Sequence, residues 1–158
     1  MKTIEIFEKQ YISNVPKEFI ELPKELLLMK YPMEQRPQIV MTDNTYTTDI
    51  KFSLLDVNTM EKITEPLTAS MKRMILDANT SYKYIEEGVI KDEKGNIASF
   101  FSFCNDVSDG IALNVIGYKQ FGKRVINISL SCPFEKQEMG MEIYVETVKR
   151  TQRKLILV

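Results

Sequence analysis

Four strand-like segments joined by short turns occupy residues 82–132, and they constrain the fold more than any other part of the sequence. The segments are residues 82–91, 97–104, 111–118 and 123–132. In the last one, Ile126, Ile128 and Leu130 alternate with other side chains, which is the period-two pattern of a half-buried strand. Each turn contains a glycine and spans about five residues. Connections this short predict a four-strand antiparallel meander.

Two amphipathic segments flank the predicted meander. Residues 65–79 carry apolar side chains at helical spacing, with Pro66 in the first turn, where a helix tolerates proline. Residues 135–154 carry a second apolar stripe, with acidic side chains near its start and basic ones near its end. That order of charges suits the helix dipole. Both segments are therefore predicted to be helices.

The region before the first predicted helix is less regular. Residues 38–41 and 49–55 predict two further strands around a polar turn. Residues 3–7 and 18–29 give no clear pattern, so no element is assigned to them.

The order of these elements predicts an α+β fold. It consists of a mostly antiparallel sheet, with the four-strand meander at about 82–132, packed by helices at about 65–79 and 135–154. The chain has 158 residues, of which 44% are hydrophobic and 27% charged. A chain of this size and composition suits one domain, residues 1–158, with a core that needs no disulfide or metal.

The two cysteines are predicted to be free thiols. Cys104 ends the second strand of the predicted meander and Cys132 ends the fourth. Two inter-strand steps would separate their Cα atoms by roughly 9–10 Å. This separation exceeds the limit of about 7 Å for a disulfide.

The sequence contains no histidine. Its absence excludes Ser-His and Cys-His nucleophile pairs and most catalytic zinc sites. Residues 117–124 match seven positions of the phosphate-loop pattern, but Arg124 stands where Ser or Thr would hold Mg²⁺. The segment also joins two predicted strands, so we interpret it as a hairpin turn. We expect no enzyme activity, no cofactor and no metal site.

Charge and hydropathy limit the partners and the compartment. The formal net charge is −1, which argues against a surface dedicated to nucleic acid or to acidic membranes. No apolar run approaches the ~20 residues of a membrane span, and the first residues lack the pattern of a signal peptide. The basic side chains near the end, Lys149, Arg150, Arg153 and Lys154, are interpreted as a solvated helix face. We expect a cytoplasmic protein that binds neither nucleic acid nor membrane.

The segment of residues 30–37 is the best candidate for contact with a partner protein. It combines Tyr31, Met33 and Arg36, residue types common at interfaces, with two prolines that restrict the backbone. The chain also contains nine methionines, and methionine-rich apolar surfaces adapt to varied partners. The alternatives are that the methionines fill the core and that the segment is a rigid connector. In that case Tyr31 packs inward and Arg36 pairs with a carboxylate.

The order of elements resembles the PsbP-like α/β/α sandwich superfamily. The features that carry the resemblance are the extended stretch from Val15 through Phe19, the single helix before the meander, Lys94-Gly95 at the first turn and the long terminal helix. This superfamily also includes a Ran-release factor and DcrB-type proteins. Residues 30–40 are similar to a segment in uncharacterised small proteins of Gram-positive, gut-type bacteria. The terminal helix lacks the tryptophan found in many relatives.

The resemblance implies a non-enzymatic module that binds or stabilises another protein, as an adaptor or a chaperone. It carries no functional residue over to this chain, because members share a fold and not a site. Our leading hypothesis is thus a protein-binding module that uses residues 30–37 and the sheet face beside them. The alternatives are a small-ligand binder or modest carboxylate-based enzyme, and an immunity-type protein that neutralises a toxin.

Overall fold

A computed structural model describes residues 1–155 of the chain. Its elements are β1 (Lys2–Ile6), β2 (Tyr11–Val15), β3 (Ile20–Glu21), α1 (Lys24–Lys30), β4 (Ile39–Thr42), β5 (Asp49–Leu54), α2 (Thr64–Ala78), β6 (Lys83–Lys91), β7 (Ile97–Val107), β8 (Gly110–Phe121), β9 (Arg124–Pro133), the 3-10 turn Phe134–Lys136, α3 (Gln137–Arg150) and β10 (Gln152–Arg153). The α+β class expected from the sequence is confirmed.

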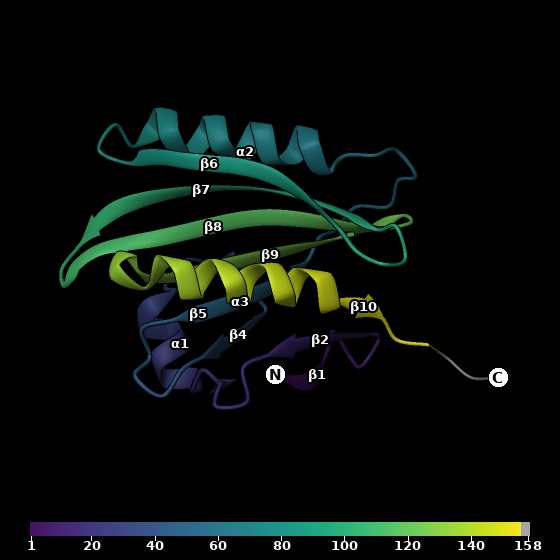
Figure 1. Ribbon diagram of the computed structural model, residues 1–158, viewed down its shortest axis with the longest axis horizontal. Helices are drawn as coiled ribbons and strands as arrows, with labels where there is room; N and C mark the ends of the chain where they lie inside the picture. The colour runs from purple at the N-terminus through teal and green to yellow at the C-terminus, as the bar shows by residue number, and fades with distance from the viewer. Residues whose placement is uncertain (156–158) are drawn as a thin grey trace.

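Seven strands form the main sheet, in the order β3-β4-β5-β9-β8-β7-β6. All neighbouring strands are antiparallel, and β6 to β9 form the predicted meander. The first half of the sheet joins the meander where β5 pairs with β9. Helices α2 and α3 lie on opposite sides of the sheet (Figure 1).

One face of the main sheet carries the apolar core. Phe52, Ile128, Gly117 and Phe100 form a row across β5, β9, β8 and β7, and α3 packs over it. The ring of Tyr144 on α3 lies edge-on to Phe100, with 5.9 Å between ring centroids. Its hydroxyl donates a hydrogen bond of 2.8 Å to the Ile128 carbonyl. This bond satisfies a polar group that would otherwise be buried at a cost.

The opposite face changes from apolar to polar along a single row of residues. Phe101 and Ile116, on β7 and β8, are followed by Ser129 on β9 and Lys51 on β5. Helix α2 packs against β7 and β8, and its Thr68 donates to the Ser99 carbonyl at 3.3 Å. The apolar part of this face therefore lies where α2 packs, while the polar part continues toward β5.

The prediction of a helix through residue 154 is wrong at its C-terminal end. Helix α3 ends at Arg150, and β10 then pairs with β2 to complete a three-stranded sheet in the order β1-β2-β10. The Lys154 amide donates to the Gln10 carbonyl at 2.8 Å. These backbone bonds to a distant strand replace the last helical turn. At the start, residues 134–136 form a 3-10 turn, so α3 begins at Gln137.

The strand order on which the free-thiol prediction depends is confirmed. Cys104 on β7 and Cys132 on β9 both lie opposite Leu113 on β8, so one strand separates them. Both cysteines are free. In the described part of the chain, no helix has the length and apolar character needed to cross a membrane.

Candidate functional site

Tyr31 is turned toward the sheet. It follows the last residue of α1, and its hydroxyl donates a hydrogen bond of 2.6 Å to Asp49 Oδ2. Lys30 Nζ donates to the same oxygen at 2.9 Å. Asp49 is only 1% exposed. The two donors therefore anchor the end of α1 to β5.

Arg36 closes the segment that follows α1. Its Nε donates a hydrogen bond of 2.9 Å to the Tyr31 carbonyl. The structure thus brings Tyr31 and Arg36 together, whereas Met33 between them is 50% exposed. Tyr31 packs inward, as the rigid-connector alternative expected. Arg36, however, bonds a backbone carbonyl and not a carboxylate.

Apolar side chains around this anchor face solvent. Helix α1 has no buried residue, and Leu28 and Met29 are 46% and 77% exposed. We call Leu28, Met29 and Met33 the α1 surface. Exposed large apolar side chains on a segment held in place by buried polar bonds are typical of interaction sites.

Lys51 is a residue of this site that the sequence did not indicate. It lies two positions after Asp49 on the same face of β5, between its cross-strand partners Val40 and Ser129. Its Nζ is 5.5 Å from the centroid of the Tyr31 ring. Burial lowers the pKa of Lys51 to about 8; the nearby Asp49 carboxylate opposes this change, and the Lys30 charge adds to it.

Burial and the neighbouring Asp49 charge raise the pKa of Tyr31 well above its ordinary value. Tyr31 therefore stays a neutral hydrogen-bond donor to Asp49 at physiological pH. Its position indicates a positioning role, holding the α1 surface on the sheet, rather than direct contact with a partner.

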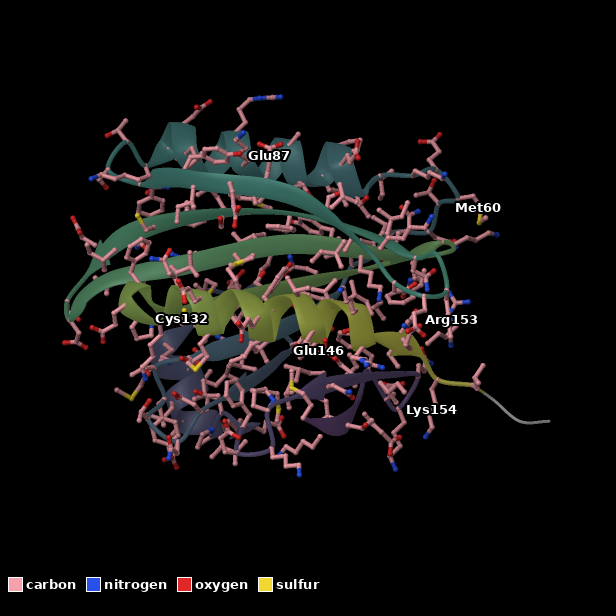
Figure 2. The ribbon with its side chains drawn as sticks, in the orientation of Figure 1. Met60, Glu87, Cys132, Glu146, Arg153 and Lys154 are labelled. Atoms are coloured by element: carbon pink, nitrogen blue, oxygen red, sulfur yellow. The ribbon has the colours of Figure 1, made fainter. Side chains whose placement is uncertain are left out.

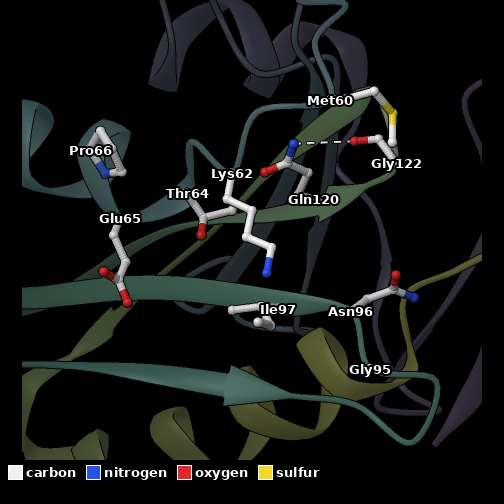
Figure 3. A pocket seen from close by; sticks show the side chains of 10 residues that line it. All are labelled: Met60, Lys62, Thr64, Glu65, Pro66, Gly95, Asn96, Ile97, Gln120 and Gly122. Carbon is white, nitrogen blue, oxygen red and sulfur yellow. Dashed lines mark hydrogen bonds between the residues drawn. The ribbon is translucent and has the colours of Figure 1, made fainter.

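A second candidate site is a cavity of about 550 Å³ at one end of the main sheet. It lies between the segment before α2, the β6–β7 turn and the β8–β9 turn (Figure 3). Lys62 extends across it toward Ile97, with Asn96 on the far side. Gln120 holds this end together, since it accepts from the Ile63 amide at 3.1 Å and donates to the Gly122 carbonyl at 3.1 Å.

Two further cavities, of about 370 and 570 Å³, adjoin the β6–β7 turn. Arg153 lines the smaller one and lies at the same end of the molecule as Met60, which lines the first cavity (Figure 2). The Arg153 side chain donates to the Phe121 carbonyl, and Lys154 and Arg150 pair with Glu5 and Glu146. Much of the terminal basic cluster is therefore engaged in contacts within the chain.

The segment resembling a phosphate loop is the hairpin turn that the sequence predicted. Gly122 lies between β8 and β9 with φ of 58°, a left-handed conformation that glycine adopts without strain. Among residues 1–155, no group of three His, Cys, Asp or Glu side chains is arranged to hold a metal ion.

Comparisons with known proteins establish the fold. No family model matches the sequence, and a search of curated proteins finds no match. Cyanobacterial PsbP (CyanoP) of Synechocystis sp. PCC 6803 has a similar structure, with a TM-score of 0.68 and 10% identity over 97% of this chain and 92% of that chain. The expectation of a PsbP-like fold is confirmed by this similarity.

Two other solved structures are similar at 10% identity. A protein of Bacteroides thetaiotaomicron VPI-5482 gives a TM-score of 0.59. The match covers 98% of this chain but only 48% of the Bacteroides protein. LpqN, involved in cell envelope biogenesis of Mycobacterium tuberculosis, gives 0.58 over 92% of this chain and 83% of that one. Identity this low supports a shared fold and no shared site.

Proposed function

We propose that this chain is a non-enzymatic protein-binding module, an adaptor or chaperone, and that a partner protein binds the α1 surface. The observation that carries the proposal is the exposure of Leu28, Met29 and Met33 on a segment anchored by Tyr31 and Asp49. A pre-organised apolar surface loses little entropy on binding.

The anchor explains how so short a helix keeps its place. Helix α1 has no fully buried residue, and Leu26 and Leu27 are half-buried. Two hydrogen bonds to one oxygen of Asp49 tie its end to β5, and the bond from Arg36 to the Tyr31 carbonyl fixes the segment that follows. Charge-assisted bonds to a buried carboxylate are among the stronger ones in proteins.

Affinity capture with matched variants tests this proposal. The double variant Met29→Glu/Met33→Glu places charges on the α1 surface, and Met74→Glu places one on α2, where Met74 is similarly exposed. We expect the tagged wild-type protein and Met74→Glu to retain one stoichiometric partner from the native cells. The double variant should lose it while keeping the wild-type free energy of unfolding. Equal capture by all three proteins would exclude the α1 surface.

The cavity at Lys62 supports a second candidate function, binding of a small ligand. Its volume lies within the range of known ligand sites, and it combines apolar Ile97 and Met60 with the polar groups of Lys62 and Asn96. Thermal-shift screening of small organic anions against wild type and Lys62→Met distinguishes this candidate. Stabilisation of wild type alone would favour it.

The proposal also covers the localisation of the protein and the classes of partner that it binds. We propose a cytoplasmic protein without nucleic-acid or membrane partners, similar to uncharacterised small proteins of Gram-positive, gut-type bacteria. An immunity-type protein that neutralises a toxin belongs to the same binding class. Localisation by fractionation of the native cells, together with the neighbouring genes, separates these cases.

A further inference from the structure

Two opposite charges line the cavity at Lys62 without pairing with each other. Lys62 and Glu65 extend in the same direction from the segment that leads into α2, and their charged ends are separate (Figure 3). Among residues 1–155, five ion pairs form, and neither side chain takes part in them. The other lining residues are uncharged. The cavity therefore presents one cation and one anion to whatever binds there.

The walls of the cavity are fixed by hydrogen bonds that do not use these two charges. On one side, Gln120 accepts from the Ile63 amide and donates to the Gly122 carbonyl, both at 3.1 Å. On the other side, Asn96 donates its backbone amide to Asp92 Oδ1 at 2.9 Å and its side-chain amide to Oδ2 at 3.3 Å. The cavity is thus preformed, so a ligand does not have to order its walls on binding.

Apolar side chains supply much of the remaining lining. Met60, Pro66 and Ile97 line the cavity, whose volume of about 550 Å³ lies within the range of known ligand sites. We propose that the cavity binds a zwitterionic α-amino acid with a large apolar side chain. Its carboxylate pairs with Lys62 and its ammonium with Glu65, while its side chain lies against Ile97 and Met60. This assignment rests on the second candidate function, ligand binding at this cavity, and names the class of ligand.

The presence of both charges favours a zwitterion over a simple ion. An anion that pairs with Lys62 comes close to the Glu65 carboxylate, which repels it, and an amine that pairs with Glu65 meets the converse problem at Lys62. An α-amino acid carries both charges close together, so it satisfies both side chains at once. Glu65 also lies in the first turn of α2, where a negative charge suits the helix dipole. That local role explains neither the cavity nor Lys62.

Calorimetric titration of the wild-type protein with matched probes tests the proposal. The probes are leucine, isocaproate, which lacks the ammonium group, and isoamylamine, which lacks the carboxylate. We expect leucine to bind at least about tenfold more tightly than either analogue, and at least about tenfold more tightly than glycine, which lacks the apolar side chain. Isocaproate binding as tightly as leucine would overturn the zwitterion and leave the cavity as an anion site. No binding of leucine would overturn the inference, while the screen of organic anions decides the second candidate function separately.

Variants assign each charge of the ligand to its partner. Glu65→Gln should weaken leucine binding about tenfold without weakening isocaproate, whereas Lys62→Met should weaken both. Glu61→Gln and Lys123→Met remove the same charges from exposed neighbouring positions that do not line the cavity, and both should bind leucine like wild type. A helix-dipole role of Glu65 changes the free energy of unfolding but not the ranking of leucine and isocaproate. Unchanged leucine affinity in Glu65→Gln, or an equal loss in Glu61→Gln, would overturn the assignment.

Discussion

Lys119 Nζ lies 2.8 Å from Asp92 Oδ2, and both side chains are 1% exposed. The same ammonium group donates to the carbonyls of Val148 at 2.6 Å and Thr151 at 2.8 Å, at the end of α3. Asp92 in turn accepts from the backbone amides of Lys94 and Asn96 in the β6–β7 turn. One ion pair therefore joins the sheet, a hairpin turn and the C-terminal end of α3.

Removing the cation should destabilise the fold strongly. Lys119→Met leaves the buried Asp92 carboxylate without its counter-ion and the carbonyls of Val148 and Thr151 without their donor, so we expect a loss of about 3–5 kcal/mol in the free energy of unfolding. Guanidinium denaturation measures it. Lys123→Met, an exposed lysine in the following turn, is the control and should stay within about 0.5 kcal/mol of wild type. Similar values for both variants would contradict the structural role of the pair.

The same pair predicts acid sensitivity. Burial raises the pKa of Asp92, but hydrogen bonds from Lys119 and from the Asn96 amide outweigh burial and hold the pKa at about 2, below its ordinary 3.8. A lowered folded-state pKa stabilises the protein fully above about pH 4, and this contribution disappears as the pH falls toward 2. Denaturation of wild type from pH 6 to pH 2 should show this decrease, and Asp92→Asn should show less of it. Parallel curves would exclude Asp92 as its source.

Gly117 is required by the packing of Tyr144. A Cβ at this position would meet the Tyr144 hydroxyl and lie 2.8 Å from the Ser99 carbonyl oxygen. We expect Gly117→Ala to cost about 2–3 kcal/mol. Tyr144→Phe loses its bond to the Ile128 carbonyl, about 1 kcal/mol, but makes room for the methyl group. The double variant should therefore be more stable than the sum of the single changes predicts; strict additivity in denaturation would refute the contact.

Lys30 should control the amine of Lys51 through charge. Its positive charge lowers the pKa of Lys51, so Lys30→Met should raise that pKa, as measured by NMR titration of the Lys51 side chain. Lys24→Met, at the other end of α1, is the matched control and should leave the pKa of Lys51 unchanged. A pKa unaffected by Lys30→Met would show that the Lys30 charge does not act on Lys51.

The sequence predicts the meander and both long helices because their signals are local. Alternation and glycine turns define each hairpin of β6 to β9, and helical spacing defines α2 and α3. The pairing of β5 with β9 carries no such signal, because those strands are far apart in the sequence. The end of α3 carries no local signal either, because the chain there continues into β10, which pairs with the distant β2.

The candidate site was only partly predictable. Residues 30–37 contain interface residue types, but the sequence does not show that Tyr31 turns inward while Met33 stays outside. Asp49 and Lys51 alternate with apolar residues, a pattern that indicates a solvent-facing side. The end of α1 and Tyr31 contact that side instead, and residues 18–29 gave no pattern from which a helix could be placed. The alternation along β8 does indicate that Lys119 is buried, because it lies on the apolar side of the strand with Gly117 and Phe121.

The three-stranded sheet has a consequence for synthesis of the chain. Ser13 and Thr151 share a hydrogen bond of 2.8 Å although 138 positions separate them. During translation β2 leaves the ribosome long before β10 exists, so only β1 is available to pair with it, and an isolated hairpin is marginal in water. Closure of this sheet is thus a late event of folding. A chain stalled before residue 153 carries an open strand edge along β2, which is a template for aggregation.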